Sequence, residues 1–322
     1  MTAPVWDPQM RAAHDAMARA AQAYPPMRLA APFDQLRATN EALNLPWAAG
    51  GPVMADTDEH WVPAQGRRVL CRVHRPLAGA ALPAMIYLHG GGWVLSSIDT
   101  HDRLARQYAA AGGVAAILVD YALAPEARFP TALLECAEIV RHVARHGAEW
   151  GVDGSRIVLA GDSAGGNLAL ATALLLREEG AALCGILAAY PATDLRLLEN
   201  PACLENPACS GDEYGLSFED MRAYRDLYLR DAIDRLHPLA SPLLADCAGL
   251  PPTLIQLAEL DPLRAEGEAM AARLHAAGIA TTLQVTPGVL HGFLRLGSRV
   301  DAAGAATGFA GPWLRQVTSP LG

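Results

Sequence analysis

The sequence predicts an α/β fold in which helices cover both faces of a mostly parallel sheet. Two observations predict this fold class. Beyond about residue 70, short apolar runs with the length of strands alternate with helical patterns. The strand-like runs are almost continuously apolar, which is typical of parallel strands that are buried on both faces. The length of 322 residues suits one large domain. Two smaller domains would also fit the length, so the order of the motifs decides between them.

The spacing of apolar residues places the elements in chain order. Residues 7–23 and 34–44 are predicted to form amphipathic helices, followed by extended segments around 53–62 and 67–75. The strands predicted in the alternating part are Ala84–Leu88, Val114–Val119, Arg156–Ala160, Leu183–Ala189, Thr253–Ala258 and Thr281–Thr286. Between them we expect helices near 101–111, 130–146, 164–179 and 264–277.

Residues 195–240 interrupt this alternation. They contain a near-repeat, ENPACLENPAC, and then a helical pattern around 217–231. We interpret the segment as an insertion over the sheet rather than a separate domain. In open α/β sheets, ligands bind at the carboxyl ends of the strands. The residues with functional side chains are therefore expected at that edge.

Composition excludes several classes of function. Charged residues make up 18% and hydrophobic residues 52% of the chain, which excludes a disordered protein. The net charge of −9 offers no attraction to nucleic acid or to anionic lipid. All 25 basic residues are arginine. A lysine nucleophile, a Schiff base and a P-loop lysine are therefore excluded.

The cysteines and the N-terminus indicate a cytoplasmic protein. None of the six cysteines belongs to a CxxC pair, and reduced thiols are expected. Cys136 and Cys184 lie in apolar periodic stretches, whereas Cys203 and Cys209 could pair only if the near-repeat folds back. The first ten residues, MTAPVWDPQM, lack the basic start and apolar core of a signal peptide. The longest apolar stretch, around 181–192, is too short to span a bilayer.

The pentapeptide Gly161-Asp162-Ser163-Ala164-Gly165 is the first motif with chemical meaning. It follows the apolar strand RIVLA directly and opens a helical run. A GxSxG motif in this strand–turn–helix context places the serine hydroxyl clear of the sheet as a nucleophile, and larger residues at 161 or 165 would clash. The alternative is an ordinary Gly/Ser turn. The context favours Ser163 as a nucleophile.

The second motif is His89-Gly90-Gly91-Gly92-Trp93, which follows the strand AMIYL. Consecutive glycines let main-chain N–H groups approach a substrate oxygen without obstruction. The tetrahedral intermediate of an ester needs such donors. A flexible loop or a nucleotide-binding turn is the alternative, but no GxGxxG spacing and no helix start follow. We interpret the motif as part of an oxyanion hole.

Asp261 and His291 complete a predicted catalytic triad. Each follows a predicted strand, and the order Ser163, Asp261, His291 is the chain order of α/β-hydrolase triads. His291 would take the serine proton, and Asp261 would hold the imidazole in the right tautomer. Two rival carboxylates are less suitable. Asp162 should point away from the base, and Glu266 stands where a helix start explains an acidic residue.

The remaining histidines offer no metal site. The sequence contains no HExxH motif, and no cofactor or metal is predicted. His142 and His146 are four residues apart on one helix without nearby acidic ligands, so a solvated helix face is the expected explanation. His101 and Asp102 are interpreted as caps of the helix that begins there.

With these motifs, the chain resembles the bacterial hormone-sensitive-lipase-like carboxylesterases, in the GDSAGG branch of that family within the α/β-hydrolase superfamily. The matching stretches cover roughly residues 70–295 in order: HGGGW at 89–93, VDYALAPEARFP at 119–130, GDSAGGN at 161–167, DPLRAEGEA at 261–269 and HGF at 291–293. Two departures stand out. Ala265 replaces an acidic residue of DPLRDEG, which predicts altered capping. The segment VLSSIDTHD after HGGGW lacks a glycine that is frequent in the family.

The resemblance implies an α/β-hydrolase fold with a helical cap. The cap would comprise 1–50 and an insertion at 195–240, and the core would comprise 51–194 and 241–322. Asp194 would anchor the start of the cap insertion. The resemblance also implies a cofactor-free esterase whose oxyanion hole uses the N–H groups of Gly91, Gly92 and Ala164.

The predicted function is hydrolysis of small carboxylic esters with short acyl chains. The cap candidates 7–44 and 195–235 are amphipathic and interrupted by charges, with enough apolar residues to roof a pocket but few for contact with lipid. Acyl chains of about two to eight carbons are expected, since each buried CH₂ helps only while the pocket has room. Amide, carbamate or lactone hydrolysis by the same triad is the alternative. A non-catalytic receptor, as in the related plant gibberellin receptors that lack the histidine, is disfavoured by His291. A homodimer is left open.

Overall fold

The computed structural model describes residues 5–27, 29–30, 32–79, 81–181, 183–196 and 214–320. The near-repeat with Cys203 and Cys209 therefore lies outside the described residues, as does part of the expected cap insertion. The predicted helix around 217–231 is described: α7 spans Phe218–Tyr228. It is capped by Ser217 and Asp220, whose side chains each accept the other residue's backbone N–H.

The described strands form one eight-stranded sheet in the order β1-β2-β4-β3-β5-β6-β7-β8. Their bounds are β1 Asp56–Ala64, β2 Arg67–Arg75, β3 Leu82–Leu88, β4 Ala115–Val119, β5 Val152–Asp162, β6 Gly185–Ala189, β7 Thr253–Leu260 and β8 Thr281–Leu290. Strands β1 and β2 pair antiparallel with each other, and β2 pairs antiparallel with β4. All other neighbours are parallel. The predicted fold class is confirmed.

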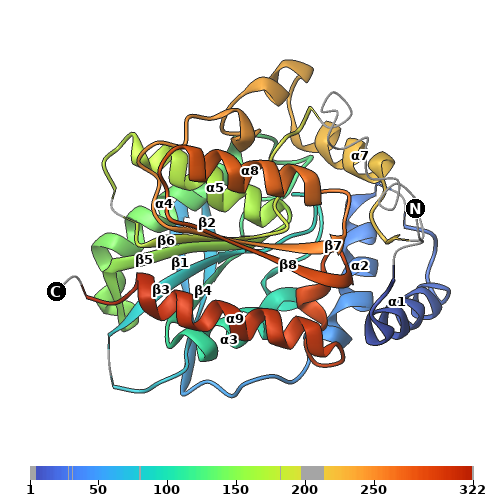
Figure 1. The fold of residues 1–322 in the computed structure, drawn as a ribbon, viewed down its shortest axis with the longest axis horizontal. Coiled ribbons are helices and arrows are strands. Elements are labelled where there is room, and N and C mark those ends of the chain that lie inside the picture. The colour runs from blue at the N-terminus through green and yellow to red at the C-terminus, as the bar shows by residue number, and fades with distance from the viewer. Residues whose placement is uncertain are drawn as a thin grey trace.

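Helices cover both faces of the sheet (Figure 1). Helices α4 (Thr131–His146), α5 (Ala164–Arg177) and α8 (Arg264–Ala276) lie on one face. Helices α3 (Ile98–Gly112) and α9 (Asp301–Val317) lie on the other. Successive residues of β3 contribute to the two cores, since Ile86 packs on the first face and Tyr87 on the second. This double burial explains why β3, β4 and β6 lack charged residues and are buried along their whole length.

The N-terminal helices lie with α7 at the end of the sheet where β7 and β8 terminate (Figure 1). Helix α1 spans Pro8–Ala21, and the carboxylate of Asp7 caps it by accepting the Met10 N–H at 2.9 Å. Helix α2 spans Phe33–Ala48, four residues beyond its predicted end. The Arg37 guanidinium fastens α2 to the loop after β3, because its Nε donates to the Val94 carbonyl at 2.9 Å.

One expectation about helices needs correction, and one helix was not predicted. Helix α3 begins at Ile98 and is capped by Ser97, so His101 and Asp102 lie inside the helix and do not cap it. Helix α9 was not predicted, although its buried residues Ala303, Ala306, Ala310 and Trp313 recur at helical spacing. None of the described helices combines the length and the apolar character needed to cross a membrane.

Candidate active site

Ser163 stands at a tight turn between β5 and α5. Its backbone has φ 56° and ψ −119°, an uncommon conformation for a residue with a side chain. The turn is held because the Ser163 N–H donates to the Ala189 carbonyl of the neighbouring strand at 2.8 Å. A Cβ on Gly161 would lie 2.4 Å from the Gly165 oxygen, and one on Gly165 would lie 1.9 Å from the Leu88 oxygen. Glycine is required at both positions, as the motif indicates.

Ser163, His291 and Asp261 form a continuous chain of hydrogen bonds. His291 Nε2 lies 2.9 Å from Ser163 Oγ, and His291 Nδ1 lies 2.7 Å from Asp261 Oδ2. Asp261 and His291 directly follow β7 and β8, which are parallel neighbours, so the sheet brings the two side chains together. The Asp261 carboxylate is fully buried and also accepts the Leu263 N–H at 2.8 Å.

This arrangement sets the roles of the two imidazole nitrogens. A carboxylate accepts hydrogen bonds, so Asp261 favours the tautomer with the proton on Nδ1. The lone pair of His291 Nε2 then faces the Ser163 hydroxyl and can take its proton. The His291 and Tyr190 rings also form a T-shaped contact with ring centroids 4.8 Å apart, which helps to hold the imidazole in this orientation.

The glycine loop after β3 lies beside the nucleophile. Gly91 and Gly92 have φ values of 117° and 61°, which favour glycine, and both line one cavity together with Ser163, Ala164 and His291. Ala164 is the first residue of α5, where amide N–H groups have no acceptor within the helix. The three N–H groups predicted for the oxyanion hole thus belong to residues around one cavity.

Asp162 has a structural place and does not contact His291. Its Oδ1 accepts the Tyr87 hydroxyl at 2.8 Å and the Gly90 N–H at 3.0 Å, and it lies 3.4 Å from His101 Nε2. Burial works to raise the pKa of Asp162, but the nearby His101 and Arg295, with the hydrogen bonds it accepts, lower this pKa below its ordinary value. Asp162 is therefore an anion that fixes the glycine loop to the nucleophile turn.

His89 also helps to hold the glycine loop in place. Its ring stacks on Tyr121 at 4.3 Å, and its Nδ1 lies 2.7 Å from the Gly90 carbonyl. Burial lowers the pKa of His89 to about 3, with a smaller contribution from His101. His89 is thus neutral at ordinary pH, and its backbone oxygen accepts the Tyr121 hydroxyl at 2.6 Å.

The expectation for Glu266 was wrong. It lies in the first turn of α8, as expected, but it is not a cap: it points inward, is fully buried and accepts the Thr193 N–H at 2.6 Å. Burial raises the pKa of Glu266 to about 8. Helix α8 begins after Leu263, which provides no side-chain cap. Asp194, which also donates its N–H to Glu266 at 3.4 Å, binds Arg196 through its own carboxylate at 2.7 Å.

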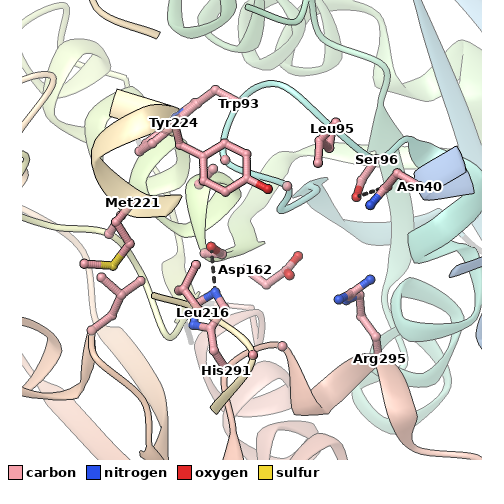
Figure 2. A pocket seen from close by; sticks show the side chains of 18 of the residues that line it. Asn40, Trp93, Leu95, Ser96, Asp162, Leu216, Met221, Tyr224, His291 and Arg295 are labelled. Atoms are coloured by element: carbon pink, nitrogen blue, oxygen red, sulfur yellow. Dashed lines mark hydrogen bonds between the residues drawn. The ribbon is translucent and has the colours of Figure 1, made fainter. Parts of the chain in front are cut away.

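The cavity beside Ser163 has a volume of about 280 Å³ and two unlike walls (Figure 2). One wall is apolar and includes Leu216, Met221 and Tyr224, from α7 and the segment before it. The other is polar and includes Asn40, Asn44, Ser96 and Arg295. The apolar α7 residues were expected in the cap, whereas the polar residues were missed. One signal was available: Arg295 follows His291 by one helical turn.

The described residues include no cluster of side chains that could form a metal site. Among the described residues, no three His, Cys, Asp or Glu side chains are placed to hold a metal ion together. The His142 and His146 rings stand 4.8 Å apart on α4 beside Trp150. Cys71, Cys136, Cys184 and Cys247 are free thiols.

Comparison with known proteins places the chain in a family. Residues 85–295 match the model of the family described as the alpha/beta hydrolase fold. The chain is 39% identical over 247 residues to an ethyl acetate hydrolase of Pseudomonas putida. The aligned region covers 74% of this chain and 75% of that protein. Over 240 residues it is also 39% identical to the carboxylesterase NlhH of Mycobacterium tuberculosis, covering 72% and 73% of the two chains.

Solved structures agree over nearly the whole length. A thermostable esterase from Pseudomonas putida superposes with a TM-score of 0.90 at 34% identity and covers 100% of both chains. A hyperthermophilic esterase from Pyrobaculum calidifontis superposes with a TM-score of 0.89 at 33% identity, covering 97% of this chain and 98% of that one. By fold, by family match and by relatives along most of its length, this chain belongs to the α/β-hydrolase fold family.

Proposed function

We propose that the protein is a serine carboxylesterase that hydrolyses small esters through an acyl-enzyme intermediate. The observation that carries the proposal is the hydrogen-bond chain from Ser163 Oγ through His291 to Asp261, at 2.9 Å and 2.7 Å. The relatives named as ester hydrolases support the same reaction class. In this proposal Ser163 is the nucleophile, His291 the general base and Asp261 the residue that orients it.

The first half of the reaction forms the acyl-enzyme. His291 Nε2 takes the Ser163 proton while Oγ attacks the ester carbonyl carbon. The negative charge that develops on the carbonyl oxygen is met by the N–H groups of Gly91, Gly92 and Ala164. When the tetrahedral intermediate collapses, the bond to the alcohol oxygen breaks and His291 returns the proton to that oxygen.

The second half releases the acid. A water molecule occupies the position that the alcohol has left and gives a proton to His291 Nε2 as its oxygen attacks the acyl carbon. The second tetrahedral intermediate uses the same three N–H groups. Its collapse breaks the bond to Ser163 Oγ, which recovers its proton from His291, and the carboxylic acid leaves.

The size of the cavity supports short acyl chains. A volume of about 280 Å³ is shared between the acyl and alcohol parts of the substrate. Each CH₂ contributes about 0.8 kcal/mol while it is buried and nothing once the cavity is full. We expect kcat/KM to rise over the first carbons and to fall beyond about eight.

The test is a panel of p-nitrophenyl esters from acetate to palmitate, with amides, carbamates and lactones included. Labelling with an organophosphate, followed by peptide mass analysis, locates the nucleophile. We expect hydrolysis of the short esters and label on Ser163, both lost in Ser163→Ala. Label on a different serine, or palmitate as the best substrate, would contradict the assignment. Absence of hydrolysis across the panel would favour a ligand-binding role.

The cytoplasmic location and the homodimer belong to the same proposal. Cell fractionation tests the location, and light scattering of the purified protein gives its molecular mass. A membrane-bound fraction would overturn the first expectation, and a monomeric mass would exclude the homodimer.

A further inference from the structure

Arg295 brings a positive charge to the polar wall of the active-site cavity. It lies in the 3₁₀ turn Phe293–Leu296 that follows His291, so the chain that positions the base also positions this guanidinium. Its Nη1 donates to Asn44 Oδ1 on α2 at 2.7 Å, which holds the side chain in place. Figure 2 shows Arg295 on the side of the cavity where Asn40 and Ser96 lie, opposite Met221 and Leu216.

No carboxylate of the described residues forms an ion pair with the Arg295 guanidinium within 4.0 Å. Behind its turn lies a second cation, Arg103, which is 2% exposed. Arg103 donates to three neutral oxygens: the Trp47 carbonyl, Gln107 Oε1 and the Arg295 carbonyl. Buried or half-buried guanidinium groups are ordinarily paired with an anion. Arg295 lines the cavity and Arg103 lies outside it, and neither has a carboxylate of the described residues in contact.

Asp162 is the acidic residue among the described cavity-lining residues, and its charge is already engaged. It accepts hydrogen bonds from Tyr87 and Gly90, lies beside His101, and is attracted by Arg295 without contacting it. Its position is fixed by these partners at the base of the glycine loop. A substrate anion bound directly to Arg295 therefore gains a charge-assisted hydrogen bond that Asp162 does not itself make.

We propose that Arg295 binds a carboxylate of the substrate, and that the preferred substrates are small esters that carry a free carboxylate a few bonds from the ester group. The inference rests on the proposed esterase function and narrows its substrate class. The Asn40 side chain accepts the Ser96 hydroxyl at 3.3 Å, which leaves its amide N–H groups as further donors for the same carboxylate. The apolar wall around Met221 and Tyr224 takes the uncharged end.

The test compares charged esters with neutral counterparts of the same shape, by pH-stat titration. For a carboxylate in the acyl part, the pair is monoethyl glutarate and ethyl 4-carbamoylbutanoate. For one in the alcohol part, it is 4-acetoxybutanoate and 4-acetoxybutanamide. We expect wild type to prefer the charged member of at least one pair, and the pair identifies which part of the ester reaches Arg295.

Arg295→Gln should lower the charged-to-neutral ratio of kcat/KM about 10- to 100-fold, as expected for loss of one hydrogen bond between charged groups. Arg295→Lys should keep part of the preference, since the charge remains. Arg299→Gln is the matched control. It removes the same charge four residues away, where Arg299 stacks on Trp47 outside the cavity, and should leave the ratio unchanged.

Wild type alone also decides the question if Arg295→Gln does not fold. Butyrate should then inhibit hydrolysis of p-nitrophenyl acetate competitively, and more strongly than butyramide. Equal ratios for both ester pairs in wild type, or equal inhibition by acid and amide, would overturn the inference while leaving the esterase proposal intact. Failure to hydrolyse p-nitrophenyl acetate would overturn the esterase proposal itself.

Discussion

Gly92 lies directly beneath the aromatic ring of Tyr224, so that a Cβ added to Gly92 would stand 2.2 Å from Tyr224 Cδ1. The glycine belongs to the loop with the proposed oxyanion donors, and the tyrosine belongs to α7. The absence of a side chain at Gly92 therefore does two things. It permits a φ of 61°, and it lets α7 cover the cavity at close range.

Gly92→Ala should lower kcat about 100-fold or more for short esters. The new methyl group has to displace either Tyr224 or the loop, and a shifted loop misplaces donors that are typically worth 10²–10³ in rate. Gly66→Ala is the matched control, because Gly66 also has a positive φ, of 78°, but open space around it. Stopped-flow or steady-state kinetics measure the effect. Partial recovery in Gly92→Ala/Tyr224→Ala would show that the ring is the obstacle, and unchanged kcat in Gly92→Ala would exclude this account.

Asp261→Asn should lower kcat by about 10³- to 10⁴-fold, whereas Glu266→Gln should lower it less than about tenfold. The asparagine amide would favour the imidazole tautomer that cannot accept the Ser163 proton. Glu266 binds the Thr193 backbone, and a glutamine oxygen can accept the same N–H. The measurement is kcat on p-nitrophenyl butyrate together with circular dichroism. A larger loss of kcat in Glu266→Gln than in Asp261→Asn would show that Asp261 is the wrong choice for the triad carboxylate.

Glu266 should also make stability depend on pH. Its pKa is raised by burial from 4.5 to about 8, so between these values the folded protein keeps a proton that the unfolded chain has released. The free energy of unfolding contributed by this group is thus fully present below about pH 4.5 and falls as pH rises to about 8, by at most about 1.4 kcal/mol per pH unit. Urea unfolding of wild type and Glu266→Gln, measured from pH 5 to 8, checks the sign. The free energy of wild type minus that of the variant should decrease; a flat or rising difference would contradict the burial argument.

Removal of residues 1–27 should raise KM with a modest loss of stability. These residues include α1, and Met17 and Met27 line the cavity. Removal of residues 1–50 should instead abolish folding. Leu36 packs in the main core, and the Trp47 carbonyl accepts a hydrogen bond from the buried Arg103 guanidinium. Thermal unfolding and the KM for p-nitrophenyl butyrate distinguish the two. An unchanged KM in the shorter deletion would show that α1 does not roof the pocket.

The strands and the three residues Ser163, Asp261 and His291 could be predicted from the sequence, because local apolar patterns and the order of the motifs indicate them. Fully apolar strands such as β3 and β4 are recognisable because both of their faces are buried. Ser163, Asp261 and His291 directly follow β5, β7 and β8, so a parallel sheet brings them to one edge. Helix α9 was not predicted because it is rich in glycine and contains Pro312, and glycine and proline are not typical of a helix interior.

Residues that depend on long-range packing could not be placed in this way. Glu266 was interpreted as a residue at a helix start because acidic residues favour that position, but the packing of α8 turns it inward towards Thr193. Arg295 and Asn44 meet across 251 positions of the chain, and no spacing rule links α2 to the turn after His291. The residues that line the cavity are therefore harder to predict from sequence than the proposed catalytic residues.

The register between β3 and β5 has a consequence for how the enzyme can change. Leu88 pairs with Gly161, so the glycine loop and the serine turn leave neighbouring strands at the same level, and Asp162 ties them together. The sheet thus holds the proposed nucleophile and the glycine loop, while α2, α7 and the turn at Arg295 supply walls of the cavity. Mutational libraries confined to these walls would therefore change substrate selectivity without disturbing the alignment of the proposed catalytic residues. The same division allows natural divergence to alter the substrate range of the enzyme while its reaction stays the same.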